Sequence, residues 1–230
     1  SSPSYTIAAA GTSGVTLGVL RITGTNENIT LDRVALQLSG VAATSSPGNV
    51  SQVYIFDGAT QVGTAIFAGS RYATSTITGV TIPANGSKVL TVKGDLASIC
   101  TNGCAGTEGA LIEVDYDNAD STGTQGRGVS SGSTINRTST SDTDVDGVRV
   151  FKSYPTVAKL AVPSSTLTTG SVVLYRFSVK SNVGENGTSI NEITANVSTS
   201  SASTANGTTT VTDLKLYAYS DAGFSTGVYG

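Results

Sequence analysis

Two parts of the chain repeat the same succession of strand-like segments. In each segment apolar and polar residues nearly alternate, which is typical of a β-strand with one buried face. The matches keep their order, and their offsets of 155, 159 and 161 residues differ only across loops. The repeat therefore predicts two similar β domains in tandem. The matched pairs are VLRITGTNEN (19–28) with LYRFSVKSNV (174–183), ITLDRVALQL (29–38) with SINEITANV (189–197), and VSQVYIFDG (50–58) with VTDLKLYAY (211–219).

The second of these pairs shares an irregularity. In ITLDRVALQL, Leu31 is followed by two polar residues before the apolar series resumes at Val34. In SINEITANV, Ile190 and Ile193 are separated in the same way. An extra residue in a strand shifts the alternation by one position. We therefore predict a β-bulge at Asp32-Arg33.

The fold class that follows is all-β, with tandem immunoglobulin-like β-sandwich domains. Further strand-like runs at 15–24, 73–82, 87–94 and 109–117 are separated by Gly, Asn, Asp, Ser and Pro. We predict a first sandwich in 1–145, which includes a short N-terminal strand segment, and a second, partial one in 146–230. We expect the interior of the first to contain Leu17, Val19, Leu31, Val34, Leu36, Val53 and Ile55.

The second repeat is shorter than the first within this sequence. Either more chain follows Gly230, or a neighbouring subunit supplies the missing strands. Strand exchange between subunits is a variant of the second alternative, and YTIAAA (5–10) is a candidate donor segment because it is short and apolar.

Composition excludes several classes of function. The net charge is −3 and charged residues make up 13%, without the basic patch of a nucleic-acid binder. No apolar run approaches the ~20 residues of a transmembrane helix. Residue 1 does not begin a leader sequence, so we expect that a signal peptide has been removed. There is no His, so a Ser-His-Asp triad is impossible, and we predict that the protein is not an enzyme. The carboxylate pair Glu113 and Asp115 is better explained as a solvent-facing strand or as calcium ligands.

The two cysteines, Cys100 and Cys104, lie in SICTNGCAG. Their spacing does not match a C-x-x-C motif, and no other Cys or His completes a zinc site. A small disulfide that stiffens a loop is the prediction, and it implies an oxidising, extracytoplasmic setting.

The segment DTDVDG lies where the first repeat ends and the second begins. Asp142, Asp144 and Asp146, followed by Gly147, resemble the first half of an EF-hand loop, but Ser153 stands where the bidentate Glu would be. The segment is therefore either a calcium-stiffened linker or a solvated acidic turn. A second acidic cluster is a candidate to close the same site or another one, or is an ordinary polar loop: Asp115, Asp117 and Asp120.

Glycosylation is a further possibility for the surface. Asn-x-Ser/Thr sequons are candidate acceptor sites, although a chain this rich in Ser and Thr also produces them by chance. The sequons begin at Asn28, Asn49, Asn85, Asn136, Asn186, Asn196 and Asn206.

Several phrases together resemble the large, repeat-built surface proteins of uncultured bacteria of the candidate phyla radiation. The phrases are GVTLGVLRITGTNENITLDRVALQL, VSQVYIFDGATQVGTAIFAGS, TIPANGSKVLTVKGDL and GVRVFKSYPTV. The resemblance implies immunoglobulin-like repeats that are exported and form a surface layer or surface fibre, and it implies no catalytic residues.

The expected function is therefore structural. We expect an extracellular cell-surface protein that assembles with copies of itself into a layer or filament, with calcium at the joint and with possible contact to cell-surface glycans. The alternative is a stalk that presents an adhesin domain beyond residue 230.

Overall fold

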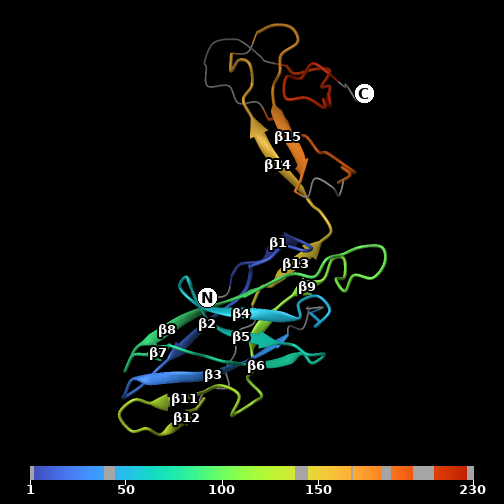
Figure 1. The fold of residues 1–230 in the computed structure, drawn as a ribbon. Coiled ribbons are helices and arrows are strands. Elements are labelled where there is room, and N and C mark those ends of the chain that lie inside the picture. Colours follow the sequence, from blue (N-terminus) through green and yellow to red (C-terminus); the bar gives the residue numbers. More distant parts are fainter. Residues whose placement is uncertain are drawn as a thin grey trace. The chain divides into compact units, whose positions relative to one another are not determined.

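The computed structural model describes residues 3–38, 45–137, 145–166, 168–182, 188–198 and 210–226. Every regular element among these residues is a β-strand, which confirms the predicted all-β class (Figure 1). The chain divides into two compact units, Ser1–Thr188 and Ser189–Gly230. Each unit is described by itself.

One layer of the β-sandwich in the first unit is a four-stranded antiparallel sheet. Its order is β2 (Val15–Thr23), β8 (Ser87–Gly94), β4 (Gln52–Asp57) and β5 (Thr60–Ile66). Between Thr16, which pairs with Lys93, and Gly18, which pairs with Val92, Leu17 is an extra residue in β2. This bulge shifts the alternation, so Leu20 and Ile22 pack against the core.

The other layer is built around β3 (Ile29–Leu38). The first half of β3 pairs with β11 (Gln125–Gly128) and β7 (Thr81–Ile82), and its second half with β6 (Tyr72–Thr76) and β10 (Val114–Tyr116). A further strand, β12 (Thr134–Asn136), pairs with β11. The register to β11 skips Asp32, because Arg33 pairs with Gln125 and Leu31 with Gly126. The predicted bulge at Asp32-Arg33 is therefore confirmed.

A third, smaller sheet has the order β1 (Thr6–Ala9), β13 (Val148–Phe151) and β9 (Leu111–Ile112), with β1 parallel to β13. The candidate donor segment YTIAAA thus pairs within its own sandwich. Val148 and Val150 of β13 are 1% and 3% exposed and belong to the core. The first core therefore extends beyond the boundary that we placed at 145/146.

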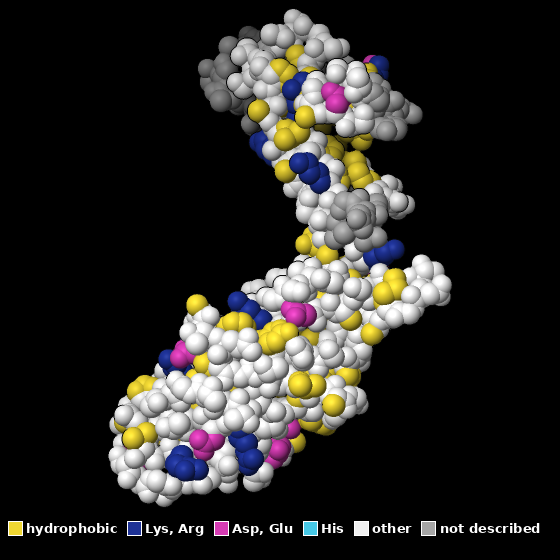
Figure 2. All heavy atoms as spheres, viewed as in Figure 1, with side chains coloured by type: hydrophobic (Ala, Val, Ile, Leu, Met, Phe, Trp, Pro, Cys, Tyr) yellow, Lys and Arg dark blue, Asp and Glu magenta, His cyan; other side chains and the backbone are white. Residues whose placement is uncertain are grey.

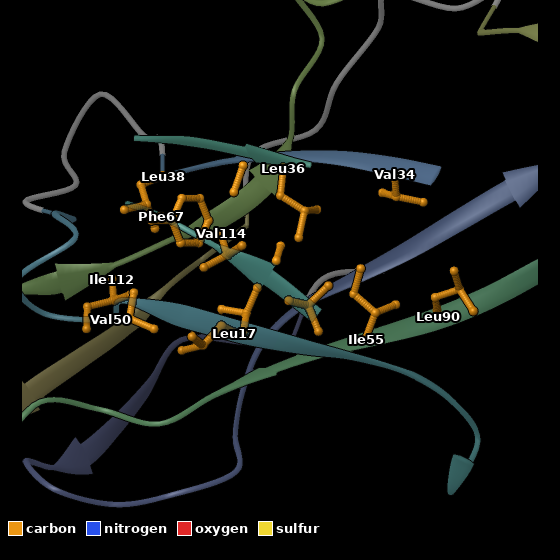
Figure 3. Packing of buried hydrophobic residues seen from close by; sticks show 14 of the residues in the cluster. Leu17, Val34, Leu36, Leu38, Val50, Ile55, Phe67, Leu90, Ile112 and Val114 are labelled. Carbon is orange, nitrogen blue, oxygen red and sulfur yellow. The ribbon is translucent and has the colours of Figure 1, made fainter. Parts of the chain in front are cut away.

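The core lies between the layers, where side chains from both sheets meet (Figure 3). Six of the seven predicted core residues are buried, and Val19 is only half-buried because the Leu17 bulge turns it away from the interior. The confirmed core residues are Leu17, Leu31, Val34, Leu36, Val53 and Ile55.

After β13 the described residues form one two-stranded sheet and contain no buried core. The strands β14 (Pro155–Leu160) and β15 (Arg176–Ser181) form a two-stranded antiparallel sheet. In the described part of the second unit, 189–198 and 210–226, no strand forms, so the strands expected at 189–197 and 211–219 are absent there. No described residue after Val150 is buried.

Candidate functional site

The candidate site is the acidic end of the first sandwich, which we define as Glu113, Asp115, Asp117, Asp120 and Asp146. It forms because one extended segment changes sheets. The segment pairs with β13 as β9 and with β3 as β10, and Glu113 stands between the two strands. The Glu113 amide donates a hydrogen bond to Ser45 Oγ at 2.7 Å, which holds the crossing in place.

The first three carboxylates of this end lie in the interior. Glu113, Asp115 and Asp117 are 5%, 2% and 6% exposed. The expectation that the pair Glu113 and Asp115 faces solvent is therefore wrong: both side chains are buried, although they alternate with the core residues Ile112 and Val114. Buried carboxylates are costly unless hydrogen bonds or cations compensate them. The fold therefore has to supply hydrogen bonds or cations that compensate these three buried carboxylates.

Asp117 and Asp120 serve the turn that follows β10. Asp117 Oδ1 accepts hydrogen bonds from the amides of Ala119 (3.0 Å) and Asp120 (3.2 Å). Asp120 Oδ1 accepts from the amide of Thr122 at 2.9 Å and from its hydroxyl at 3.1 Å. The bond from the Thr122 amide is the main reason why the pKa of Asp120 lies below its usual value. These two carboxylates thus order the backbone of their own loop.

Arg137 closes the same turn from the end of β12. Its Nε donates to the Asp120 carbonyl at 2.9 Å, and its Nη2 donates to the Asn118 carbonyl. The guanidinium lies 6.0 Å from the ring of Tyr116, whose pKa is raised chiefly by burial. Arg137 could not be predicted as part of this site, because its position inside the sequon of Asn136 indicates only an exposed loop.

The segment DTDVDG (142–147), which we call the joint motif, meets the acidic end at its last residue, Gly147. Asp142 and Asp144 lie outside the described residues, and Asp146 is exposed. Gly147 has a φ of +77°, and a Cβ at this position would lie 2.8 Å from Glu113 Cγ. Because Val148 pairs with Ile112, the residue before β13 comes against the residue after β9. Gly147, the last residue of the joint motif, therefore lies next to Glu113.

No group of three or more His, Cys, Asp or Glu is placed to hold a metal ion among the residues that the structure describes. Calcium at Asp142, Asp144 and Asp146, or at Asp115, Asp117 and Asp120, stays a prediction. The hydrogen bonds of Asp117 and Asp120 show that these two have a structural role in the turn.

The disulfide prediction is confirmed. Cys100 and Cys104 are bonded, with their Cα atoms 5.5 Å apart, in an exposed loop. The loop is anchored at its base by hydrogen bonds from Ala97 N to the Asn49 carbonyl and from Gly106 N to the Ser98 carbonyl. A disulfide is compatible with a secreted or extracellular protein.

The sequons differ in access. Asn28, Asn85, Asn136 and Asn196 are exposed, while Asn186 and Asn206 lie outside the described residues. Asn49 is 4% exposed, and its Oδ1 accepts from the Thr107 amide at 2.8 Å. A glycan on this buried amide would displace the loop, so we remove Asn49 from the candidate acceptors of the folded protein.

Within the described ranges, no helix is long and apolar enough to span a membrane. Comparisons with protein-family models, with curated proteins and with solved structures found no match to this chain.

Proposed function

We propose that this chain is an extracellular structural protein, built from tandem immunoglobulin-like repeats, that assembles with copies of itself into a cell-surface layer or filament. The observation that carries the proposal is the contrast between a fully built core and large apolar side chains that are mostly exposed in the described part of the chain. Val157, Tyr175, Leu214 and Leu216 are each 59–66% exposed. Proteins that remain monomeric rarely leave large apolar areas in contact with water.

The first sandwich supports a structural role. Its two layers enclose a core whose central side chains, such as Leu36 and Ile55, are fully buried. The disulfide and the anchored loop suit an oxidising environment outside the cytoplasm. The proposal assigns no catalytic residue, and exposed sequons such as Asn28 and Asn85 are the candidate positions for contact with surface glycans.

The proposed calcium site is the segment DTDVDG (142–147), at the joint between the two repeats. The contact between Gly147 and Glu113 supports a cation there, because it places the last residue of the motif next to a buried carboxylate. A bound ion would restrict the link between the repeats and thereby the geometry of the assembly.

Electron microscopy of the purified chain, with calcium and then with chelator, tests the proposal. We expect ordered sheets or fibres with calcium and dispersal in chelator. Asp142→Asn, Asp144→Asn and Asp146→Asn combined should have the effect of chelator, while the control Asp213→Asn, at an exposed carboxylate elsewhere, should assemble normally. Arrays that persist in chelator would remove calcium from the proposal. Dispersed, rod-like monomers in both conditions would refute assembly and favour the adhesin stalk.

A further inference from the structure

The hairpin formed by β14 and β15 has two chemically different faces. Opposed residues of an antiparallel pair lie on the same face. The pairs Val157 with Val179 and Lys159 with Phe177 therefore form one face, whose only charge is at the end of a long aliphatic side chain. The opposite face carries the pairs Thr156 with Lys180, Ala158 with Ser178 and Leu160 with Arg176.

The apolar face of this hairpin, defined by Val157, Phe177 and Val179, is only partly covered by the described residues. Val157 is 66% exposed, and Phe177 and Val179 are half-buried. The Tyr175 ring extends the face, with its centroid 5.7 Å from that of Phe177. Figure 2 shows apolar side chains at the surface among Lys and Arg in this part of the molecule.

The internal repeat identifies the same face independently. The offset of 155 residues places Tyr175 at the position of Leu20 and Phe177 at the position of Ile22. In β2, Leu20 and Ile22 pack against the core of the first sandwich. The exposed Tyr175 and the half-buried Phe177 therefore lie on the face that the counterpart strand packs against its core. A two-stranded hairpin alone is marginally stable in water, so a covering surface would stabilise this one.

Charge indicates what that surface is. Residues 152–184 contain four basic and no acidic side chains: Lys152, Lys159, Arg176 and Lys180. Among the described residues, no carboxylate forms an ion pair with Lys159 or Lys180. Residues 1–151 contain eight basic and twelve acidic side chains, a net charge of −4. Two hairpins would repel each other, whereas a hairpin and a sandwich attract.

We infer that the apolar face of the β14–β15 hairpin docks onto the first sandwich of a second copy of this chain. The contact joins different surfaces of the two copies, so repetition produces a head-to-tail series. The inference rests on the proposed function and adds to it the surface and the partner through which assembly occurs.

A zero-length carbodiimide cross-linker, which joins amines directly to carboxylates, tests the contact in the full chain. Unlabelled and 15N-labelled chains are mixed, cross-linked under assembly conditions and analysed by mass spectrometry. We expect mixed-isotope cross-links from Lys152, Lys159 or Lys180 to carboxylates within 1–151. Arrays in the microscope without such cross-links would overturn this inference and leave the proposed function standing. Monomers that form no arrays would overturn both.

Sedimentation measurements on variants test whether the apolar face and the positive charges of the hairpin drive self-association. Phe177→Ser with Val179→Ser should weaken self-association by about tenfold or more, because it removes the apolar face. Lys159→Glu with Lys180→Glu should weaken it most at low salt. The control Ser178→Thr, on the opposite face, should stay within about twofold of the unmodified chain. Far-UV circular dichroism and sandwich unfolding should not change in any variant. Undiminished association of the Phe177 and Val179 variant would overturn the inference, as would binding of the hairpin only to an added anionic polysaccharide.

Discussion

Strand β3 and residues 189–197 carry the same apolar spacing in different surroundings. Leu31 and Val34 of β3 are 3% and 0% exposed, whereas their counterparts Ile190 and Ile193 are 52% and 44% exposed. The local sequences are equally suited to a strand. The difference is that β3 pairs with four other strands, and its apolar face meets a second sheet.

The apolar face of a strand and the burial of that face are two separate properties. Alternation specifies which face of a strand will be apolar, but burial depends on partner strands that come from elsewhere in the chain or from another chain. The first repeat has those partners in residues 60–128, between β5 and β11. Beyond β13, the described residues of the second repeat contain one hairpin, and apolar side chains there, such as Ile190 and Leu214, are exposed.

The largest expected effect comes from removing matched apolar side chains. Leu31→Ala should lower the free energy of unfolding of the first sandwich by about 2–5 kcal/mol, because it leaves a cavity in a close-packed core. Ile190→Ala should change it by less than about 0.5 kcal/mol. Urea denaturation followed by circular dichroism measures both. A comparable loss in the two variants would show that Ile190 is part of a buried core.

The strands with strong alternation could be predicted from the sequence. The expected segments 29–38 and 87–94 coincide with β3 and β8, because both alternate apolar and polar residues along their length. The expected strand at 73–82 is divided into β6 and β7 around Gly79, which has a φ of +74°. β11 was not predicted because QGRG has no apolar side chain. Its Gly126 allows close approach to β3, where a Cβ would lie 2.6 Å from Ile29 Cγ2.

The sequence predicts which residues make up most of the candidate site, but it does not predict how they are buried or which contacts they make. The acidic residues and the joint motif stand out in the sequence. The burial of Glu113 and Asp115 does not, because their alternation with the core residues Ile112 and Val114 places them on the side away from the core, where a strand pattern predicts exposure. The role of Arg137 depends on a contact across the hairpin of β11 and β12, and its local sequence carries no sign of it.

A smaller effect is expected at two glycines with positive φ. Gly147→Ala should destabilise the first sandwich by about 1–3 kcal/mol, because it combines backbone strain with a contact of 2.8 Å to Glu113 Cγ. Gly170 has a φ of +111° but no neighbouring atom within 4 Å of a built Cβ. Gly170→Ala should therefore leave sandwich unfolding unchanged in the same denaturation measurement. An effect of Gly170→Ala equal to that of Gly147→Ala would mean that both repeats unfold as one cooperative unit.

The smallest expected effect concerns Glu27, whose carboxylate joins the loop before β3 to the turn between β11 and β12. Its oxygens accept hydrogen bonds from the Ser131 hydroxyl at 2.7 Å and from the amides of Ser130 (2.9 Å) and Ser131 (3.0 Å). The hydroxyl is the largest cause that holds the pKa of Glu27 below its usual value. Since the folded pKa is the lower one, the stabilisation is present above the unfolded pKa and is lost as pH falls through the folded pKa.

Carboxyl NMR titration should therefore place the Glu27 pKa below that of an unstructured glutamate. Amide exchange at Ser130 and Ser131 should accelerate in the same acidic range. Ser131→Ala removes the hydroxyl and should raise the Glu27 pKa towards its usual value, while the buried strands keep their protection. An ordinary Glu27 pKa in the unmodified chain would show that the link between these loops does not form in solution. The turn of β11 and β12 would then be held by its own backbone hydrogen bonds and by the pairing of β11 with β3.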